Sequence, residues 1–280
     1  MDTTFAPIEQ SLVRLNDGRM MPQLGFGVFK VPAEEAAALV GDAIVAGYRA
    51  IDTAMIYQNE EGVGAGIRDS GVPRDQIFLT TKLWNADQGY DATLRAFDAS
   101  AERLGMAPDL YLIHWPCPAK TLFLETWKAF VRLQEEGRVR SIGVSNFREK
   151  DIERIVHQTG VKPVLNQIEL HPRFQQVELR AYLDENDIAV ESWSPLGQAQ
   201  ILQDPVITRI AEKHGRSAAQ VVIRWHLDQG IITIPKAADR KHMVDNLSVG
   251  GFKLDDEDMD AIAALDDAEG RIGPDPSSFS

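Results

Sequence analysis

Eight short runs rich in β-branched and other apolar residues alternate along this chain with longer amphipathic segments. Parallel strands are joined by crossovers of a dozen or more residues, usually helices, so this alternation predicts a parallel sheet. Eight strands commonly close such a sheet into a barrel. The predicted strands are Gln23–Gly27, Arg49–Thr53, Ile77–Lys82, Leu110–His114, Arg140–Ser145, Val164–Ile168, Ala189–Trp193 and Ile231–Pro235.

The amphipathic segments predict helices that connect the strands and cover the sheet. Before the first strand, Leu12–Met20 predicts a β-hairpin that turns at Asn16-Asp17-Gly18, because Asp-Gly is a strong turn signal. Near the end, the acidic segment Asp255–Asp267 predicts a further helix with a solvated face. We therefore predict an α/β fold, a (β/α)8 TIM barrel with an N-terminal β-hairpin and extra C-terminal helices. The predicted connecting helices are Ala33–Ala46, Ala92–Leu104, Leu122–Glu136, Lys150–His157, Val177–Asn186, Pro205–His214 and Ala218–Gln229.

A doubly wound open sheet is the rival topology, and its nucleotide site usually carries G-x-G-x-x-G after the first strand. The first predicted strand here ends in Gly25-Phe26-Gly27-Val28-Phe29-Lys30, which lacks the third glycine. Another group of glycines, Gly62, Gly64 and Gly66, follows a helical stretch, and we interpret it as close packing at the end of a helix. The sequence therefore favours the closed barrel.

The chain length and charge limit the domain count and the partners. Its 280 residues fit one domain, predicted to span residues 1–280, because such barrels usually have about 250 residues. The formal net charge of −13 opposes binding to nucleic acid or to an anionic membrane. No run approaches the roughly 20 apolar residues of a membrane span, and the first ten residues lack the basic and apolar regions of a signal peptide. Cys117 is the only cysteine, which rules out an intrachain disulfide and favours the cytoplasm.

Polar and aromatic side chains gather where the predicted strands end. In a parallel barrel the carboxyl ends of the strands form one rim, and the active site lies at that rim. A single polar residue there often caps a helix or satisfies the core, but seven consecutive strand ends carry such residues here. They are Asp52 with Tyr57 in the loop after it, Lys82-Leu83-Trp84, His114-Trp115-Pro116, Ser145-Asn146, Asn166-Gln167, Trp193-Ser194 and Pro235-Lys236.

Four of these residues form a set suited to carbonyl reduction. The phenol of Tyr57 titrates near pH 10, and a neighbouring cation would lower its pKa and make proton donation feasible. Lys82 can supply that charge, and Asp52 can hold Lys82 while offsetting the cost of burying it. His114 can hydrogen-bond the substrate carbonyl and help to stabilise a developing oxyanion. With a hydride arriving from one side, Tyr57 would be the general acid.

Two competing mechanisms lack their residues. Short-chain dehydrogenases use Tyr-x-x-x-Lys on one helix, and none of the five tyrosines has a lysine four residues later. A metal-dependent mechanism needs clustered ligands, but the six histidines show no i, i+4 pair and there is one cysteine. We predict no metal site.

Stretches spread over nearly the full length of the chain match one known family, from Met21-Pro22-Gln23-Leu24-Gly25-Phe26-Gly27 to the C-terminal tail. The other matching stretches are Gly47-Tyr48-Arg49-Ala50-Ile51-Asp52-Thr53-Ala54, Tyr57-Gln58-Asn59-Glu60, Thr81-Lys82-Leu83-Trp84-Asn85, Leu110-Tyr111-Leu112-Ile113-His114-Trp115-Pro116, Ile142-Gly143-Val144-Ser145-Asn146-Phe147, Asn166-Gln167-Ile168-Glu169-Leu170-His171-Pro172, Glu191-Ser192-Trp193-Ser194-Pro195-Leu196-Gly197 and Ile234-Pro235-Lys236. In these stretches the chain resembles the aldo-keto reductases, most closely bacterial members such as the 2,5-diketo-D-gluconate reductases.

The resemblance implies a role for each matching position. It implies that Asp52, Tyr57, Lys82 and His114 form a catalytic tetrad, in agreement with the roles assigned above. It also implies a set of cofactor contacts and an aromatic substrate slot. Ser145, Asn146 and Gln167 would bind the nicotinamide carboxamide, Trp193 would stack on the ring, Ser194, Leu196 and Gln198 would follow the pyrophosphate and ribose, Asn246 would contact the adenine, and Phe26, Trp84 and Trp115 would wall the pocket.

The densest basic patch of this acidic chain is Lys236-Ala237-Ala238-Asp239-Arg240-Lys241-His242. We interpret it as a clamp for the 2′-phosphate of NADPH rather than only a solvated helix start. Relatives usually have Ser or Thr at the position of Ala237 and Arg at that of His242, and both changes remove phosphate contacts. We therefore expect NADPH to be preferred, with NADH possible.

The leading hypothesis is an NADPH-dependent aldo-keto reductase that acts on a small aldehyde or ketone. Two alternatives stay open: alcohol oxidation in the reverse direction, and a non-catalytic barrel that binds nucleotide. Specificity would come from the loops Trp84–Tyr90 and Pro116–Thr121 and from the tail Gly270–Ser280, which we expect to fold over the pocket mouth. Without a heptad pattern or an exposed apolar stripe, the sequence favours a monomer.

Overall fold

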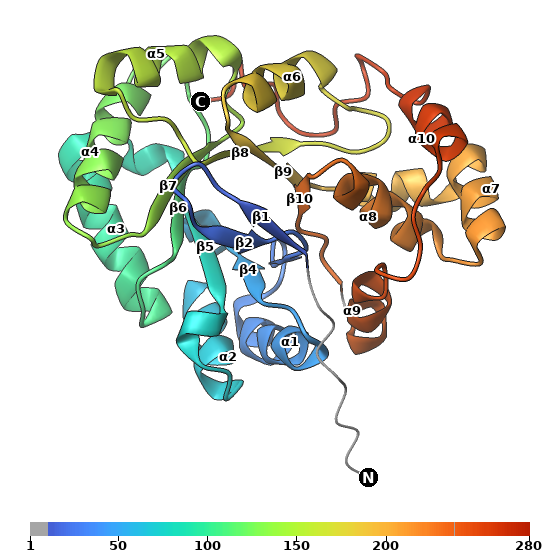
Figure 1. The fold of residues 1–280 in the computed structure, drawn as a ribbon. Helices are drawn as coiled ribbons and strands as arrows, with labels where there is room; N and C mark the ends of the chain where they lie inside the picture. Colours follow the sequence, from blue (N-terminus) through green and yellow to red (C-terminus); the bar gives the residue numbers. More distant parts are fainter. Residues whose placement is uncertain (1–10, 238) are drawn as a thin grey trace.

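The computed structural model of this chain describes residues 11–237 and 239–280. Its centre is a parallel sheet in which the strands follow one another in chain order, with helices outside it (Figure 1). The fold-class prediction is therefore confirmed. The strands of this sheet are β3 (Phe26–Gly27), β4 (Ala50–Asp52), β5 (Phe78–Leu83), β6 (Leu110–Ile113), β7 (Ser141–Ser145), β8 (Leu165–Glu169), β9 (Ala189–Trp193) and β10 (Ile232–Thr233).

The sheet closes between its first and last strands. Leu24, just before β3, forms a parallel bridge with Thr233 of β10. The Thr233 N–H donates to the Gln23 carbonyl at 2.9 Å, and the Gly25 N–H donates to the Thr233 carbonyl at 2.9 Å. This closure gives the sheet a single rim at the carboxyl ends of all eight strands.

The predicted hairpin forms from β1 (Leu12–Arg14) and β2 (Met20–Pro22), and the Gly18 N–H closes the turn on the Leu15 carbonyl. The hairpin lies across the end of the barrel opposite the rim formed by the carboxyl ends of the strands (Figure 1). Its buried Leu15 and Met21 belong to one cluster with residues in or next to the barrel strands. The other buried residues of that cluster are Leu110, Leu112, Val164, Leu165 and Ile232. The hairpin therefore seals the barrel bottom with apolar side chains.

Ten α-helices lie within the described residues, and most begin and end within two residues of their predicted bounds. No helix in the described ranges is long and apolar enough to cross a membrane. The helices are α1 (Ala33–Ala46), α2 (Glu60–Asp69), α3 (Tyr90–Leu104), α4 (Phe123–Glu135), α5 (Glu149–Thr159), α6 (Val177–Glu185), α7 (Pro205–His214), α8 (Ala218–Asp228), α9 (Arg240–Leu247) and α10 (Asp256–Ala263).

The glycines at positions 62, 64 and 66 pack closely, as predicted, but they lie inside α2 rather than at the end of a helix. A Cβ atom added at Gly64 would come within 1.9 Å of the Leu104 carbonyl oxygen, and one at Gly66 within 2.6 Å of the Ala37 carbonyl oxygen. The glycines therefore let the backbone of α2 approach α1 and the end of α3, although glycine weakens a helix interior.

Candidate active site

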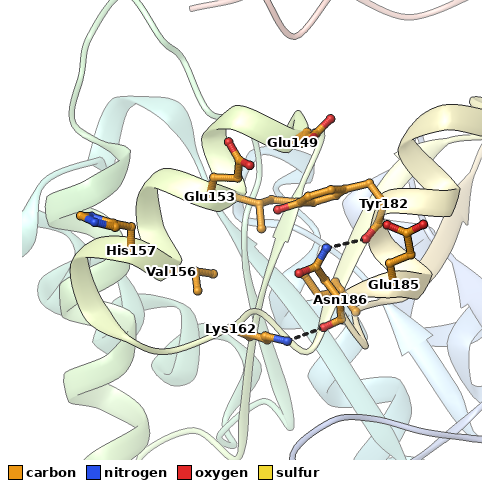
Figure 2. A pocket seen from close by; sticks show the side chains of 10 residues that line it. Glu149, Glu153, Val156, His157, Lys162, Tyr182, Glu185 and Asn186 are labelled. Atoms are coloured by element: carbon orange, nitrogen blue, oxygen red, sulfur yellow. Dashed lines mark hydrogen bonds between the residues drawn. The ribbon is translucent and has the colours of Figure 1, made fainter.

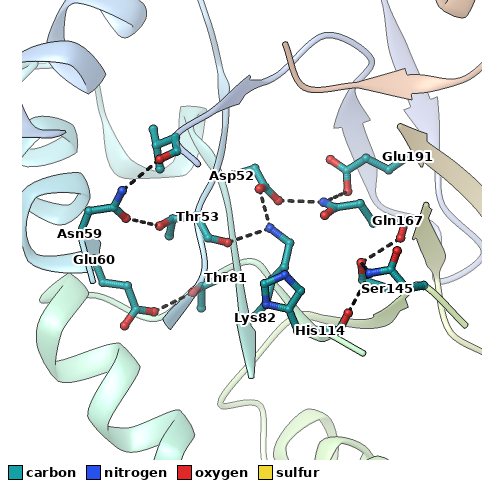
Figure 3. Close-up of polar contacts among 12 residues, drawn as sticks. Asp52, Thr53, Asn59, Glu60, Thr81, Lys82, His114, Ser145, Gln167 and Glu191 are labelled. Atoms are coloured by element: carbon teal, nitrogen blue, oxygen red, sulfur yellow. Dashed lines mark hydrogen bonds and ion pairs between the residues drawn. The ribbon is translucent and has the colours of Figure 1, made fainter. Parts of the chain in front are cut away.

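Four residues from neighbouring elements lie at the rim formed by the carboxyl ends of the strands, here called the catalytic rim, and Figure 3 shows three of them, Asp52, Lys82 and His114. Asp52 ends β4, Lys82 is the last but one residue of β5, and His114 directly follows β6. Tyr57 ends the short 3-10 helix Met55–Tyr57 in the loop after β4. The structure thus brings together the tetrad predicted from the strand ends.

Lys82 and Asp52 form a buried ion pair. The Lys82 Nζ lies 2.5 Å from Asp52 Oδ1, and the two side chains are 0% and 4% exposed. Lys82 also donates to the Thr53 carbonyl oxygen at 2.9 Å. Burying a charge costs several kcal/mol unless it is paired and hydrogen-bonded. Asp52 and the Thr53 carbonyl meet that requirement and fix the ammonium in place.

The ammonium of Lys82 lies 5.3 Å from the centre of the Tyr57 ring. Burial raises the pKa of Tyr57, while Lys82 lowers it and Asp52 raises it, and the net result is a pKa above the usual 10.0. Lys82 therefore lowers the pKa of Tyr57, as expected from the sequence. In the protein without cofactor, however, burial of the phenol raises this pKa by more than Lys82 lowers it.

His114 is held in its neutral form. Burial and the nearby charge of Lys82 both lower its pKa, to well below the usual 6.5. Its ring contacts the edge of Trp84, with ring centres 5.3 Å apart, and that of Tyr57 at 5.9 Å. A neutral imidazole next to a phenol can donate one hydrogen bond to a carbonyl oxygen without adding a second positive charge.

The predicted nicotinamide-binding residues form a hydrogen-bonded group across three strands. Trp193 donates from Nε1 to Asn146 Oδ1 at 2.8 Å, which fixes the indole plane. The Asn146 amide donates to the His114 carbonyl and to Ser145 Oγ, both at 3.0 Å. Ser145 in turn donates to the Gln167 carbonyl at 2.8 Å. These contacts hold the four side chains in one arrangement beside the tetrad.

Gln167 connects this group to the tetrad. Its Nε2 donates to Asp52 Oδ2 and to Glu191 Oε2, both at 2.9 Å (Figure 3). Glu191, on β9, is fully buried. Burial and the charge of Asp52 raise its pKa from 4.5 to about 8. Sequence reasoning missed Glu191; the signal that could have found it is an acidic residue in the middle of a predicted parallel strand, because parallel sheets are buried on both faces.

The backbone after several strands adopts left-handed conformations at residues other than glycine. Cys117 has a φ of 43°, Asn146 of 61° and Ser194 of 50°, and Gln198 and Ala199 follow with 51° and 70°. Such conformations are uncommon and cluster at functional sites. All five residues follow β6, β7 or β9 at the catalytic rim, so the strain coincides with the tetrad and the predicted cofactor contacts.

Two of the three residues of the predicted aromatic slot lie beside the tetrad. Trp84 and Trp115 lie beside His114, with Trp115 6.5 Å from it between ring centres. Placing Phe26 in the pocket wall is wrong: its ring is 0% exposed and packs on Tyr48 in the core between sheet and helices.

Phe29, rather than Phe26, lies beside the tetrad. It is 51% exposed, and its ring centre lies 5.1 Å from that of Tyr57. Asn59 holds the loop that carries Phe29, since its Nδ2 donates to the Val28 carbonyl at 3.0 Å and to the Val31 carbonyl at 3.2 Å. The aromatic residue that faces the tetrad is therefore set by the loop after β3.

The C-terminal tail covers the same rim, as expected. The ring of Phe279 lies 4.6 Å from that of Trp115, between centres, and 6.4 Å from that of Trp84. The buried carboxylate of Glu169, at the end of β8, accepts the N–H groups of Ile272 and Gly273. This tether ties the tail to the barrel wall next to Trp193.

The basic patch precedes and begins α9, with Ala238 outside the described residues. Lys236, Arg240 and Lys241 are exposed. Asp239 caps α9: its carboxylate accepts the His242 N–H at 2.9 Å and lies 2.8 Å from His242 Nδ1. Asp239 thus pairs with the His242 side chain and places a negative charge at the start of α9.

The remaining predicted cofactor contacts lie on two elements. Ser194 directly follows β9, and Leu196 and Gln198 lie at the start of the 3-10 segment Gly197–Gln203. Asn246 is 5% exposed on α9.

A separate open groove of about 510 Å³ lies on the outside of the barrel between α5 and α6 (Figure 2). Glu149, Glu153 and Glu185 line it together with Tyr182 and Lys162. None of the tetrad residues borders this groove, so it is not the candidate active site.

Comparison with known proteins agrees with this geometry. A family model described as "Aldo/keto reductase family" matches residues 23–267. An aldo-keto reductase of Mycolicibacterium smegmatis is 52% identical over 269 residues, which cover 96% of this chain and 98% of that protein. The glyoxal reductase of Bacillus subtilis is 50% identical, with coverage of 95% and 96%.

A solved structure of a Gox0644 mutant in complex with NADPH superposes on the fold with a TM-score of 0.94. The two sequences are 52% identical, and the match covers 97% of this chain and 99% of that one. Fold, sequence and family model agree over nearly the whole chain, which belongs to the aldo/keto reductase family.

Proposed function

We propose that this protein reduces a small aldehyde or ketone to the alcohol with NADPH, using Tyr57 as the proton donor. The observation that carries this proposal is the buried Lys82–Asp52 pair, with its ammonium 5.3 Å from the Tyr57 ring centre. A fixed cation beside a phenol stabilises the phenolate that remains after proton transfer. Burying a lysine this deeply costs free energy. The need to stabilise the Tyr57 phenolate after proton donation would explain why the charge is there.

The residues around the rim fit a nicotinamide nucleotide. The indole of Trp193 is held by Asn146 and is partly exposed, as a ring that stacks on a nicotinamide would be. Gln167 uses its amide nitrogen on two carboxyl groups, which leaves its Oε1 to accept a hydrogen bond from a carboxamide. The exposed Lys236, Arg240 and Lys241 provide positive charge where a 2′-phosphate would bind.

The chemistry then divides between cofactor and chain. When bound, the nicotinamide supplies the hydride that adds to the carbonyl carbon. His114, being neutral, donates a hydrogen bond to the carbonyl oxygen and orients it toward Tyr57. The Tyr57 hydroxyl gives its proton to that oxygen, and Lys82 stabilises the phenolate left behind. Asp52 keeps Lys82 in position through the step.

The aromatic rings around Tyr57 favour small substrates. Phe29, Trp84, Trp115 and Phe279 narrow the approach to Tyr57 with aromatic rings. The glyoxal reductase of Bacillus subtilis, 50% identical, is named for a two-carbon dicarbonyl. We therefore propose short dicarbonyls as the preferred substrate class.

The test is a carbonyl panel read by the loss of NADPH absorbance, with glyoxal, methylglyoxal, a sugar-derived ketone and an aromatic aldehyde. We expect the highest kcat/KM with the two short dicarbonyls and a lower rate when NADH replaces NADPH at the same concentration. The absence of NADPH oxidation with every carbonyl would overturn the proposed reaction, and faster turnover with NADH would overturn the cofactor preference.

We propose that the protein works in the cytoplasm as a monomer without a nucleic-acid partner. The net charge of −13 supports the last point, because nucleic-acid binding needs a broad basic face. The single cysteine, Cys117, is buried and free, which suits a reducing compartment.

A further inference from the structure

We propose that Glu191 is a positioning residue of the reductase, holding Gln167 and, through it, the Asp52–Lys82 pair from inside the barrel. The inference rests on the proposed carbonyl reduction and adds a residue to it. The motifs that indicate the tetrad do not point to Glu191, which touches neither Tyr57 nor Lys82 through a direct hydrogen bond. Glu191 is linked to the Asp52–Lys82 pair through the side-chain amide of Gln167.

The geometry around Gln167 permits one orientation of that amide. Asp52 Oδ2 and Glu191 Oε2 each lie 2.9 Å from the same nitrogen, and both are acceptors. The amide nitrogen has two hydrogens, so the two carboxyl groups use both. The Gln167 oxygen is thereby directed away from them. Without Glu191, one of the two hydrogens would have no acceptor and the amide could rotate.

Glu191 is suited to this role as a neutral acid. Its Oε1 has no hydrogen-bond partner within the part of the chain that the structure describes, so little stabilises a negative charge there. The charged and titratable groups that face it are Asp52 from β4, Lys82 from β5 and Tyr57 from the loop after β4. The adjacent strands β8 and β10 place Gln167 and Ile232 opposite Glu191, and neither carries a charge.

Ionisation of Glu191 would disturb proton donation. The raised pKa of about 8 keeps Glu191 protonated at neutral pH, so the buried set holds one carboxylate and one ammonium. Above pH 8 a second carboxylate appears beside Asp52. A charged Glu191 raises the pKa of Tyr57, which makes Tyr57 a poorer acid. Reduction should therefore slow as Glu191 loses its proton.

The experiment compares wild type with Glu191→Gln, which keeps an acceptor for Gln167 but cannot ionise. We expect wild-type kcat for methylglyoxal reduction to fall up to about tenfold between pH 7 and pH 9, because roughly a tenth of a group with a pKa near 8 stays protonated at pH 9. E191Q should match wild type at pH 7 to within about twofold and lose most of that decline. The same decline in E191Q would overturn the inference.

A second variant, Glu191→Leu, removes the acceptor as well. We expect it to weaken NADPH binding, measured by quenching of tryptophan fluorescence, by up to about tenfold, the size of one lost hydrogen bond. Glu60→Gln is the matched control: Glu60 is 1% exposed but bonds to Thr81 and Arg103, away from Gln167. It should keep both the pH profile and the NADPH affinity. Unchanged affinity in E191L would count against the positioning role.

A readout without turnover separates this inference from the proposed function. The infrared difference spectrum of the protein between pH 6.5 and pH 9.5 should lose a protonated carboxyl band that E191Q lacks. If wild type reduces none of the carbonyls, the proposed function fails, while this band and the NADPH affinity of E191L still decide the role of Glu191. Absence of the band in wild type would contradict a protonated Glu191.

Discussion

Among the residues expected to bind the cofactor, His242 stands at a position where relatives carry arginine. His242 lies 2.8 Å from the Asp239 carboxylate in place of the arginine expected in relatives. His242→Arg should raise the ratio of kcat/KM with NADPH to that with NADH about tenfold, the value of one charge-assisted hydrogen bond to phosphate. Initial rates with both cofactors measure this ratio. His157→Arg, on the exposed face of α5, is the control and should leave the ratio unchanged; an unchanged ratio in H242R would exclude His242 from the phosphate site.

Lys82 and His114 show how far single residues of the site could be predicted. Both stand at strand ends, and in a closed parallel barrel the side chains there share one rim, so their convergence with Asp52 followed from strand order. The strand pattern could not locate Glu191, which lies two residues before the end of β9 and is hydrogen-bonded to the tetrad through Gln167. Contacts across the barrel interior depend on how the strands are staggered, and the periodicity of a single strand carries no information about that stagger.

The regular alternation along the sequence predicted the strands and most of the helices. The wrong placement of a side chain arose from a loop. The resemblance to the family placed Phe26 in the pocket, but β3 is two residues long and the ring of Phe26 packs on Tyr48. The loop after it turns Phe29 to Tyr57, and that path depends on hydrogen bonds from Asn59, thirty residues later. Local propensity carries no information about such a distant contact.

Two glycines in adjacent helices should respond oppositely to alanine. Among the residues that the structure describes, a Cβ at Gly41, inside α1, would meet nothing within 4 Å, whereas one at Gly64 would strike the Leu104 carbonyl oxygen. Gly41→Ala should raise the free energy of unfolding by about 0.5–1 kcal/mol through helix propensity. Gly64→Ala should lower it by about 1–3 kcal/mol or more through overpacking. Urea unfolding measures both, and a stable Gly64→Ala variant would contradict the close approach of α2 to α3.

At the scale of the whole molecule, closure at Leu24 and Thr233 makes one ring of eight strands, and the hairpin seals its bottom. Strand count and order predicted this arrangement because eight parallel strands with right-handed crossovers have few alternatives. The tail was harder: its path over Trp115 depends on the Glu169 carboxylate accepting two tail N–H groups. That the chain from 1 to 280 is one domain stays a prediction.

The stability of the barrel should depend on pH through His226. This residue is 0% exposed, its Nδ1 lies 2.8 Å from the Val222 carbonyl, and burial lowers its pKa from 6.5 to about 4. Below pH 6.5 this histidine is protonated in the unfolded chain, whereas in the folded protein it stays neutral until about pH 4. The free energy of unfolding therefore falls as the pH drops from 6.5 to 4. The loss should approach about 3 kcal/mol.

Urea unfolding of wild type, His226→Gln and His157→Gln across pH 7 to pH 4 measures this effect. H226Q should show a shallower acid loss than wild type, and H157Q, changed at an exposed position, should follow wild type. Equal acid slopes in H226Q and wild type would show that His226 is not the group responsible.

The proposed role of Tyr57 as proton donor can be tested with Tyr57→Phe, because the ring contacts with Phe29 and His114 remain while the hydroxyl is lost. Carbonyl reduction by wild type and variant should be compared under saturating NADPH, with NADPH affinity measured on the same samples. We predict unchanged NADPH affinity and a fall in kcat of about 10²–10⁴-fold. A variant that reduces methylglyoxal at a rate within a few-fold of wild type would show that Tyr57 is not the proton donor.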